Sequence, residues 1–476
     1  MGFITYEFLV FFAAFFALYW MGKSRNWKNL LLLFASYIFY GWLVPWHVAV
    51  LFLSTLVDYF LALGIARSKS WAAFLTALGV GLNIGLLVFV KYYLFFNFSF
   101  ASLLNQVGLS GDVFLTRLIL PLGLSFYILK KISYLIDVRR GTFQPTRDFV
   151  AFAAYVSFFP QVFSGPIDRP QKLLKQLEEP REWKADHFFN AWHLLVMGLF
   201  KKVVIANTVK VLVDQIFLLE EPSKILLLVG GLGFALQILA DFSSYTDISR
   251  GIAYLLGLET AENFNHPYLA LTPSDFWNRW HISLSTWLRD YIFFPLRRAL
   301  LRKRNIFPEV LIQSIPPLVT MFVSGLWHGV GWQFVVWGLY YGVLIVIYQL
   351  LGIRADPSTT LKTDQGPAAR FKLFFTWLTM FLLIVFGWMI FRAQTLGWLW
   401  NVLANAPLYR TPQELIAGFV LLAMIAFYSS FLVIKYLFDR FLASNPNLEA
   451  LYYAGATVAI IVFMNSSSPD FIYFQF

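Results

Sequence analysis

The stretch Ser324-Gly325-Leu326-Trp327-His328-Gly329 lies between two long apolar segments, 309–326 and 330–351. A helix needs roughly 20 apolar residues to cross a hydrocarbon core of about 30 Å, and each segment is close to that length. The two segments therefore predict a helical hairpin in a membrane, with an imidazole between its arms. An ionisable side chain at membrane depth is costly, so His328 is a candidate functional residue.

The whole chain has the composition of a multi-pass membrane protein. Of its 476 residues, 59% are hydrophobic and 13% are charged, whereas soluble domains carry about 25% charged residues. The net charge of +11 comes from basic residues in short loops between apolar segments. This is the positive-inside pattern of a membrane protein. The expected partner is therefore the lipid bilayer, and nucleic-acid binding is not expected. Because the chain has no cysteine, disulfides and thiolate nucleophiles are excluded.

Apolar segments suited to crossing a bilayer recur along the chain. Three of them, 30–43, 149–163 and 449–464, are short for a crossing. We therefore expect an all-α polytopic protein with about 11 transmembrane helices, together with re-entrant or interfacial helices. The full set is 3–20, 30–43, 47–66, 71–95, 117–136, 149–163, 188–217, 225–248, 309–326, 330–351, 371–392, 413–437 and 449–464.

No segment reads as a separate soluble domain, so we predict one membrane-embedded domain over 1–476. Its parts would be N-terminal helices over 1–136, a catalytic core over about 149–351 and C-terminal helices over 371–476. No internal repeat is evident, which argues against transporter folds that are built from inverted halves.

The charges of the loops predict the orientation. Alternating loops are basic, whereas 43–46 and 97–116 carry only Asp112, which places the N-terminus outside and the basic loops in the cytoplasm. His328 would then lie at the far end of its hairpin, away from the basic loops. The basic groups are Lys23, Arg25 and Lys28; Arg67 and Lys69; Arg139, Arg140 and Arg147; Arg297, Arg298, Arg302, Lys303 and Arg304; and Arg354, Lys362, Arg370 and Lys372.

Two stretches differ from ordinary spans. Residues 164–187 predict a turn followed by an interfacial helix. Residues 259–300 predict a helix that opens at Phe276 after a Ser274 or Asp275 cap. That helix is too polar to face lipid, so it must be interfacial or shielded by protein. Its polar residues are Asn278, Arg279, His281, Arg289 and Asp290.

Each candidate residue has a functional and a structural interpretation. Ser324, Gly325 and Gly329 would let a substrate approach His328, or would let two helices pack closely. His281 and Ser285 are one helical turn apart and could form a base and nucleophile, but we favour a Ser285 hydroxyl bonded to its own helix. Too few ligands are present for a catalytic metal.

The stretch Asp241-Phe242-Ser243-Ser244-Tyr245-Thr246-Asp247 could hold an ion, but we favour structural hydrogen bonds. Two buried histidines together suggest a different chemistry. Acyl transfer from a thioester to an alcohol needs a base, alignment of the substrates and a donor for the developing oxyanion. A membrane location suits a donor on one side and an acceptor on the other.

At these residues the chain resembles the membrane-bound O-acyltransferase family, and within it the bacterial alginate O-acetyltransferase type. The likeness extends over nearly the whole chain. It differs at Pro295-Leu296-Arg297-Arg298, where the alginate type commonly has Gly-Gly-Asn-Arg, and Gly165-Pro166-Ile167-Asp168-Arg169 is similar to D-alanyl transferases of teichoic acid. The motifs that carry it are 279–291 (Arg-Trp-His-Ile-Ser-Leu-Ser-Thr-Trp-Leu-Arg-Asp-Tyr), 325–329, 241–247, 262–265, 164–167 and 123–127.

The resemblance implies a tunnel through the membrane, with His328 as the catalytic histidine and His281 as the second signature residue. It implies a cytoplasmic thioester donor, acetyl-CoA or an acyl carrier protein, and no permanently bound cofactor. The acceptor would be an extracytoplasmic polysaccharide or a hydrolase-like acetyltransferase partner, reached from a bacterial inner membrane.

We therefore predict an O-acyltransferase, with acetyl as the expected acyl group. His328 would be the general base, and His281 would position or polarise the donor carbonyl. Two alternatives stay open: D-alanyl transfer to a cell-wall polymer, and a proton-coupled transporter of a polysaccharide precursor. An inactive scaffold is disfavoured because both histidines are present. The residues expected to line the tunnel are Trp280, Trp327, Ser324, Asn278, Ser285, Asp241, Tyr245 and Asn263.

Overall fold

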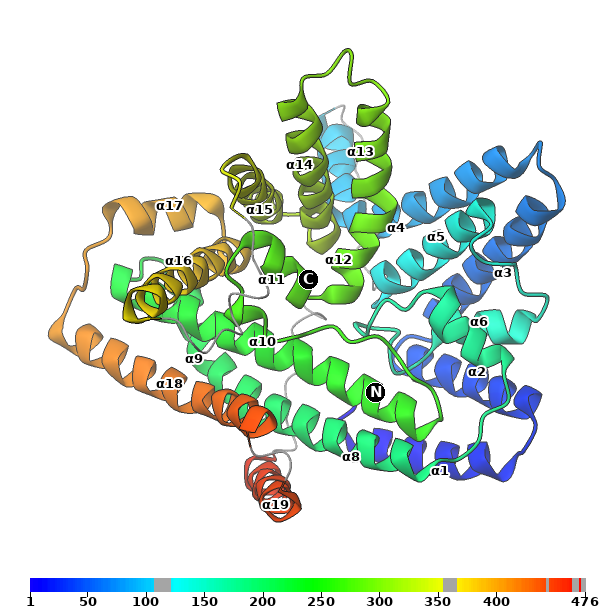
Figure 1. Cartoon of the computed structure of the whole chain (residues 1–476), viewed down its shortest axis with the longest axis horizontal. Helices are drawn as coiled ribbons and strands as arrows, with labels where there is room; N and C mark the ends of the chain where they lie inside the picture. Colours follow the sequence, from blue (N-terminus) through cyan, green and yellow to red (C-terminus); the bar gives the residue numbers. More distant parts are fainter. Residues whose placement is uncertain (107–120, 354–365, 442–444, 465–470, 472–476) are drawn as a thin grey trace. The chain divides into compact units, whose positions relative to one another are not determined.

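The computed structural model describes residues 1–106, 121–353, 366–441, 445–464 and 471. Regular structure in these residues is helical, apart from one isolated bridge between Phe264 and Trp280. The predicted all-α class is confirmed (Figure 1). The predicted span 117–136 begins outside the described residues, and Asp112, Arg354 and Lys362 also lie outside them.

Eight helices of the described part are long and apolar enough to cross a membrane. They coincide with predicted segments, so the multi-pass prediction is confirmed, while the number of about 11 crossings stays a prediction. The shorter α1 (Tyr6–Met21) is also apolar. The eight are α3 (Trp46–Arg67), the 72–92 part of α4 (Ala72–Gln106), α10 (Lys224–Leu255), α14 (Glu309–His328), α15 (Trp332–Leu350), α16 (Pro367–Arg392), α18 (Pro412–Phe441) and α19 (Pro446–Phe463).

The contacts divide the chain into two compact units. Unit 1 comprises residues 1–194 and 248–261, and unit 2 comprises 195–247 and 262–476. The prediction of a single domain stays a prediction. Besides α1, α3 and α4, unit 1 contains α2 (Arg25–Gly41), α5 (Leu124–Arg140), α6 (Phe149–Ser157), η1 (Pro170–Leu174), α7 (Lys175–Glu178) and most of α8 (Ala185–Phe200). Unit 2 adds η2 (Lys201–Ala206), α9 (Asn207–Leu218), η3 (Pro267–Leu269), α11 (Pro273–Arg279), α12 (Ile282–Leu288), η4 (Arg289–Phe293), α13 (Phe294–Leu301) and α17 (Leu396–Asn405).

Buried polar side chains tie the helices of unit 1 together. Asp58 of α3 accepts hydrogen bonds from Asn83 of α4 at 2.9 Å and forms an ion pair with Lys131 of α5 at 3.1 Å. Both charged side chains are essentially inaccessible. An isolated charge would be costly there, so each stabilises its partner and the contact fixes three helices against one another.

In unit 2, α14 and α15 approach each other unusually closely because glycines face one another. A Cβ atom on Gly338 would lie 2.3 Å from the carbonyl oxygen of Met321, and one on Gly325 would lie 2.3 Å from that of Phe334. Such distances exclude any side chain, so the glycines allow backbone-to-backbone packing. Helix packing is therefore what Gly325 provides, rather than space for a substrate.

The predicted span 188–217 is helical throughout, as α8, η2 and α9, with the π-helical η2 in its middle. Within 164–187 the predicted turn is followed by η1 and α7 and then by an irregular stretch over 179–184. One sequence prediction needs correction. The helix expected to open at Phe276 begins at Pro273, and its cap is Thr272, whose hydroxyl accepts from the Asp275 N–H. Pro at the first position of a helix sets its start, a signal that outweighed Ser274 and Asp275.

The glycine contact makes a test of the hairpin possible. Gly338→Ala should lower the free energy of unfolding by about 1–3 kcal/mol, because its methyl group would collide with backbone that cannot give way. Thermal unfolding of the purified protein measures the effect. Gly455→Ala in α19 is the matched control, since its Cβ would meet no atom within 4 Å. Equal melting temperatures for the two variants would contradict the packing role.

Candidate active site

His328 is the last residue of α14, and aromatic rings from three helices enclose it. Its ring centroid lies 4.9 Å from that of Trp327, 5.0 Å from that of Trp337 on α15 and 5.5 Å from that of Phe391 on α16. All three pairs are edge-to-face, which is the favourable arrangement for aromatic rings. The side chain is 6% exposed. The imidazole is therefore held in a defined orientation away from bulk water.

His281 was expected to lie within a helix. It lies instead in the break between α11 and α12. Its φ of 43° is in the left-handed region, which is unusual for a residue other than glycine. A backbone held in this region is typical of functional sites. The ring is fully buried and contacts Phe242 of α10 at 4.7 Å. Burial lowers the pKa of His281 to about 3, so the imidazole is neutral at physiological pH.

Asn263 fixes the break at His281 from a distant part of the chain. Its backbone carbonyl accepts from the Ile282 N–H and its side-chain Oδ1 accepts from the Ser283 N–H, both at 3.0 Å. These are the first N–H groups of α12, which have no partner within the helix. Asn263 thus caps α12 and holds the left-handed turn in place.

The two histidines meet through one indole. The centroid of Trp327 lies 6.1 Å from that of His281 and 4.9 Å from that of His328. The two imidazole centroids can be no farther apart than the sum of these distances. The residues that the sequence placed far apart are therefore neighbours around Trp327.

Beside His328 lies a group of buried polar atoms without hydrogen-bond partners. Trp337 contacts His328 directly, and its ring lies 5.6 Å from Trp277 and 5.5 Å from Tyr341. Folded proteins leave few such groups, and each costs about 1–3 kcal/mol. Buried hydrogen-bond donors without partners suit a ligand that carries hydrogen-bond acceptors. The atoms are Ser324 Oγ, Trp277 Nε1, Trp337 Nε1 and Tyr341 Oη.

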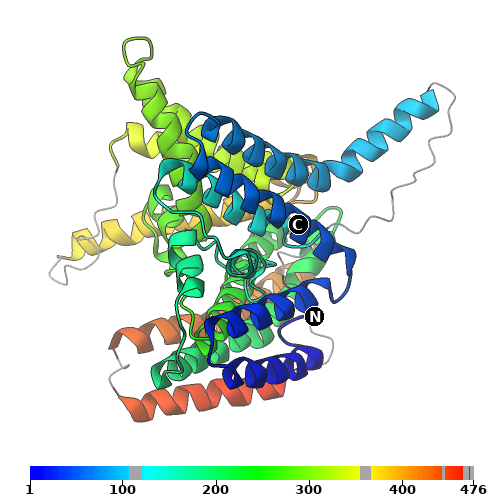
Figure 2. The same ribbon diagram turned by 90° about the vertical axis from the view of Figure 1, so that its right-hand side faces the viewer.

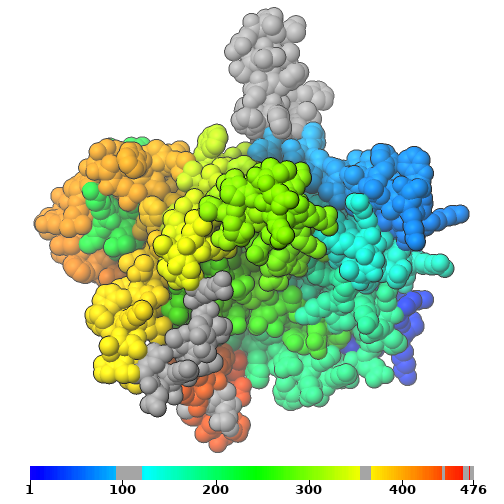
Figure 3. All heavy atoms as spheres, turned by 45° about the horizontal axis from the view of Figure 1, so that its top comes forward, coloured from blue at the N-terminus to red at the C-terminus, as the bar shows by residue number. Residues whose placement is uncertain are grey.

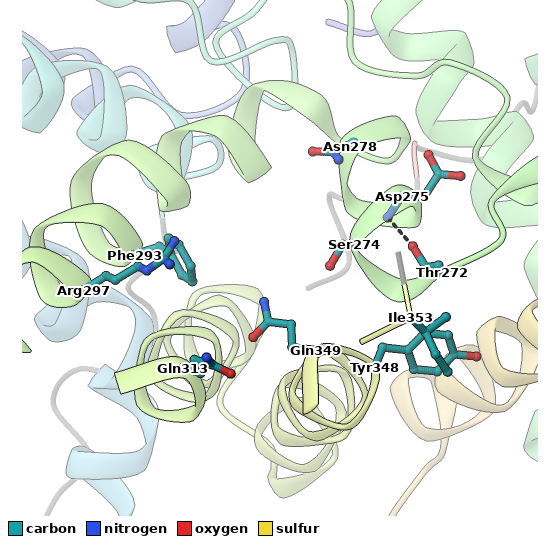
Figure 4. Close-up of a pocket in the computed structure, with 10 residues that line it drawn as sticks. All are labelled: Thr272, Ser274, Asp275, Asn278, Phe293, Arg297, Gln313, Tyr348, Gln349 and Ile353. Carbon is teal, nitrogen blue, oxygen red and sulfur yellow. Dashed lines mark hydrogen bonds between the residues drawn. The ribbon is translucent and has the colours of Figure 1, made fainter. Parts of the chain in front are cut away.

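Two adjoining cavities open near the other end of α14. The larger has a volume of about 520 Å³ and a largely polar lining, including Asn278, Gln349 and Arg297 (Figure 4). The smaller, of about 170 Å³, is lined by α14 residues Pro317, Thr320 and Met321 and by Trp277. Both cavities share Ser274, Asn278, Phe293 and Gln349, so they lie next to each other.

The smaller cavity lies along the face of α14 that leads to His328. Pro317, Met321, Ser324 and His328 follow one another at intervals of four, three and four residues, which places them on one side of a helix. Trp277 lines the cavity and contacts Trp337, which contacts His328. The cavity and the histidine are thus connected by one helix face and one pair of indoles.

The structure sorts the other predicted tunnel residues into two groups. Asn278 and Ser285 line the smaller cavity, and the Ser285 hydroxyl donates to the backbone carbonyl of Trp280 at 3.1 Å, which lies just before α12 rather than in Ser285's own helix as favoured from the sequence. Trp280 is buried in the aromatic core, 4.8 Å from Trp388.

Asp241 and Tyr245 have packing roles. Asp241 forms a buried ion pair with Lys202 at 2.7 Å, and the Tyr245 ring contacts that of Phe471 at 5.1 Å. Asp247 likewise pairs with Lys201 at 2.7 Å. The polar stretch 241–247 therefore ties α10 to η2, which agrees with the structural interpretation.

Sequence reasoning missed Trp337, Phe391 and Phe242, the rings that contact the two histidines. Each is an aromatic residue in an apolar helix and looks like ordinary core. The only available signal was the excess of aromatic residues over what membrane interfaces need.

In the described part of the chain, no three His, Asp or Glu side chains are grouped as metal ligands.

Comparison with known proteins identifies relatives over most of the chain. Residues 146–392 match the model of the membrane-bound O-acyltransferase family. The chain is 37% identical to a probable alginate O-acetylase AlgI of Pseudomonas putida, over 81% of this chain and 76% of that protein. It is 29% identical to a peptidoglycan O-acetyltransferase of Helicobacter pylori (81% and 75%) and to a teichoic acid D-alanyltransferase of Bacillus subtilis (58% and 70%).

The cap of α12 yields a test of how His281 is held. Asn263→Ala should lower the free energy of unfolding by about 1 kcal/mol, the usual value of a helix cap, and should reduce the acyl-transfer rate because the turn at His281 loosens. Thermal unfolding and a transfer assay measure the two effects. Asn265→Ala, an exposed neighbour, is the control. If the two variants behave alike, Asn263 does not position His281.

Proposed function

Because the chain belongs to the membrane-bound O-acyltransferase family, we propose that it moves an acetyl group from a cytoplasmic thioester to a hydroxyl on the other side of the membrane. The acceptor is a polysaccharide or a protein partner that modifies one. The observation that carries the proposal is the placement of His328 and His281 against one buried indole.

In the proposed reaction His328 is the general base. Its imidazole takes the proton of the acceptor hydroxyl, and the oxygen attacks the carbonyl carbon of the thioester. The tetrahedral intermediate then expels the thiolate, and the thiolate takes the proton from the His328 imidazolium. No covalent enzyme intermediate is required, because the chain aligns both substrates around one base.

The developing oxyanion needs hydrogen-bond donors, and the site offers several. Trp337 Nε1 and Ser324 Oγ are buried without partners, Trp337 contacts His328, and Ser324 is one helical turn before it. Neutral His281 can donate from one ring nitrogen to the same carbonyl, the role expected from the sequence. Donors fixed in advance in a dry site stabilise such charge strongly.

The two adjoining cavities are the proposed entrance for the donor. Arg297 lines the larger one, and a guanidinium is suited to the phosphate groups of acetyl-CoA or of the phosphopantetheine on an acyl carrier protein. Arg298, Arg302, Lys303 and Arg304 add exposed positive charge on and just after α13, the green surface region near residue 300 in Figure 3. In the orientation that the loop charges predict, this is the cytoplasmic end and the N-terminus lies outside.

Acetyl is proposed over D-alanyl because the relatives matched over about four fifths of this chain are named for O-acetylation. The D-alanyltransferase is matched over 58% of the chain and is the second candidate. Membership of this family argues against the alternative of a proton-coupled transporter. The proposed setting is a bacterial inner membrane, with an extracytoplasmic acetyltransferase as partner.

Replacement of His328 tests the proposed base. His328→Ala should reduce acetyl transfer in proteoliposomes by at least about 100-fold, the usual contribution of acid–base catalysis. The variant should still insert and elute as one species, since the backbone contact of α14 with α15 at Gly325 and Gly338 does not involve the His328 side chain. His187→Asn in unit 1 is the control. Retained transfer by a folded His328→Ala protein would refute the role.

Arg297 offers a test of donor entry. Arg297→Gln should raise the KM for the donor by about 5-fold, in line with about 1 kcal/mol for a partly exposed charge pair, and leave kcat nearly unchanged. Steady-state kinetics at varied donor concentration separate the two constants. Arg304→Gln, exposed outside the cavity lining, is the control. A fall in kcat without a change in KM would contradict the proposed entrance.

A further inference from the structure

Unit 1 contains a pair of buried cations that is separate from the acyl-transfer site. Lys28, in the first turn of α2, is 3% exposed, and Arg181, in the irregular stretch between α7 and α8, is 6% exposed. The Lys28 ammonium donates to the backbone carbonyl of Arg181 at 2.7 Å, so the two side chains belong to one cluster. Two buried positive charges side by side are unfavourable unless a negative charge joins them.

The protein supplies only neutral partners to these two cations. Lys28 lies over the ring of Trp20, 4.0 Å from its centroid. Arg181 donates to the side-chain oxygen of Asn29 and interacts with the Tyr19 hydroxyl, and it lies 5.6 Å from the centroid of the Tyr19 ring. Aromatic faces and amide oxygens attract a cation but do not neutralise it. Each contact fixes a cation in place without cancelling its charge.

The carboxylates near the cluster do not complete it. Within the described residues, neither Lys28 nor Arg181 has a carboxylate at ion-pair distance. Asp148 is already paired with Arg25 at 3.3 Å, and Glu182 is exposed and acts on Lys28 only through its field. Burial, reinforced by the charge of Arg181, lowers the pKa of Lys28. The net charge of the cluster is therefore positive.

Arg181 also has unused hydrogen-bond donors. Its Nε and Nη1 atoms are buried and have no hydrogen-bond partner. Guanidinium N–H groups are almost always satisfied in proteins, and their preferred partners are carboxylate and phosphate oxygens. Positive charge and unused donors in the same cluster both point to an anion.

The surroundings indicate a membrane interface. Trp183, 47% exposed, contacts Trp20 at 5.4 Å, and Trp27 is 44% exposed. Tryptophans of this kind gather at the level of the lipid headgroups. In Figure 2 the antiparallel α1 and α2 lie side by side in dark blue, and the turn between them carries Lys23 and leads to Arg25 and Lys28. Basic clusters next to a membrane attract anionic lipid headgroups.

We propose that Lys28 and Arg181 form a binding site for a phosphate group, and that the phosphate belongs to a phospholipid headgroup. The headgroup phosphate accepts from the unused N–H groups of Arg181 and neutralises both cations, while the exposed tryptophans contact the glycerol and upper acyl chains. All of its residues belong to unit 1, whereas those of the proposed acyl-transfer site belong to unit 2.

The test uses the full chain, freed of lipid in an uncharged detergent. Its thermal unfolding is followed during titration with dioctanoyl-phosphatidylglycerol, with inorganic phosphate, and with dioctanoylglycerol, which lacks the phosphate. Phosphatidylglycerol should raise the midpoint saturably by about 3–5 °C, and dioctanoylglycerol should not. An equal response to inorganic phosphate would assign the same site to a free phosphate.

Variants locate the effect. Arg181→Gln should abolish the shift, and Lys28→Gln provides the same test if Arg181→Gln does not fold. Arg139→Gln, an exposed arginine at the end of α5, should keep the full shift. The proposal is overturned if the variants respond like the wild type, if dioctanoylglycerol gives the same shift, or if neither phosphate-bearing probe gives a saturable shift in the wild type.

Discussion

The close backbone contact between α14 and α15 is the constraint on which the rest of the site depends. At Gly325 and Gly338 the two helices come nearer than any side chain would allow. This brings Trp337 of α15 to the His328 ring at the end of α14, and places Phe334 beside Phe391 at 5.0 Å. His328 is therefore enclosed by rings from α14, α15 and α16.

Polar groups in this protein fall into two kinds that differ in how they are satisfied. Asp58 with Lys131, and Asp241 with Lys202, are buried charges whose partners come from neighbouring helices. Such pairs hold neighbouring helices together. Several donors around His328, and the Nε and Nη1 atoms of Arg181, are equally buried and have no hydrogen-bond partner in the protein. We assign these donors to ligands rather than to the fold.

Much of the fold followed from the sequence because membrane spans are determined locally. A run of apolar residues must be helical in a bilayer, since no water satisfies its backbone. The π-helical part of 188–217 that begins at Lys201 was not predicted, because it leaves the apolar pattern intact. The break at His281 was also missed, since a left-handed residue other than glycine has no signal of its own. Its cause is Asn263, whose hydrogen bonds to α12 are made only in the folded chain.

The candidate site was accessible from the sequence only in part. His328 was singled out because an imidazole between two spans is costly, and His281 because it lies in a polar segment. Their common neighbour Trp327 is adjacent to His328 in the chain, so its contact with His281 could not be inferred from spacing. Trp337 and Phe391 could not be predicted as site residues, because the sequence does not show whether an aromatic residue in an apolar helix packs in the core or lines the site. Contacts between distant helices decide which it is.

The most direct test of the acyl-transfer account is an experimental structure of the protein with a thioether analogue of the acyl donor, which cannot react. The account predicts that the carbonyl of the analogue lies beside His328, with its oxygen toward Trp337 Nε1 or Ser324 Oγ. The arm that carries the carbonyl should run along the α14 face past Met321 to the cavity at Asn278. A carbonyl bound elsewhere, with His328 still enclosed by protein rings alone, would contradict the account.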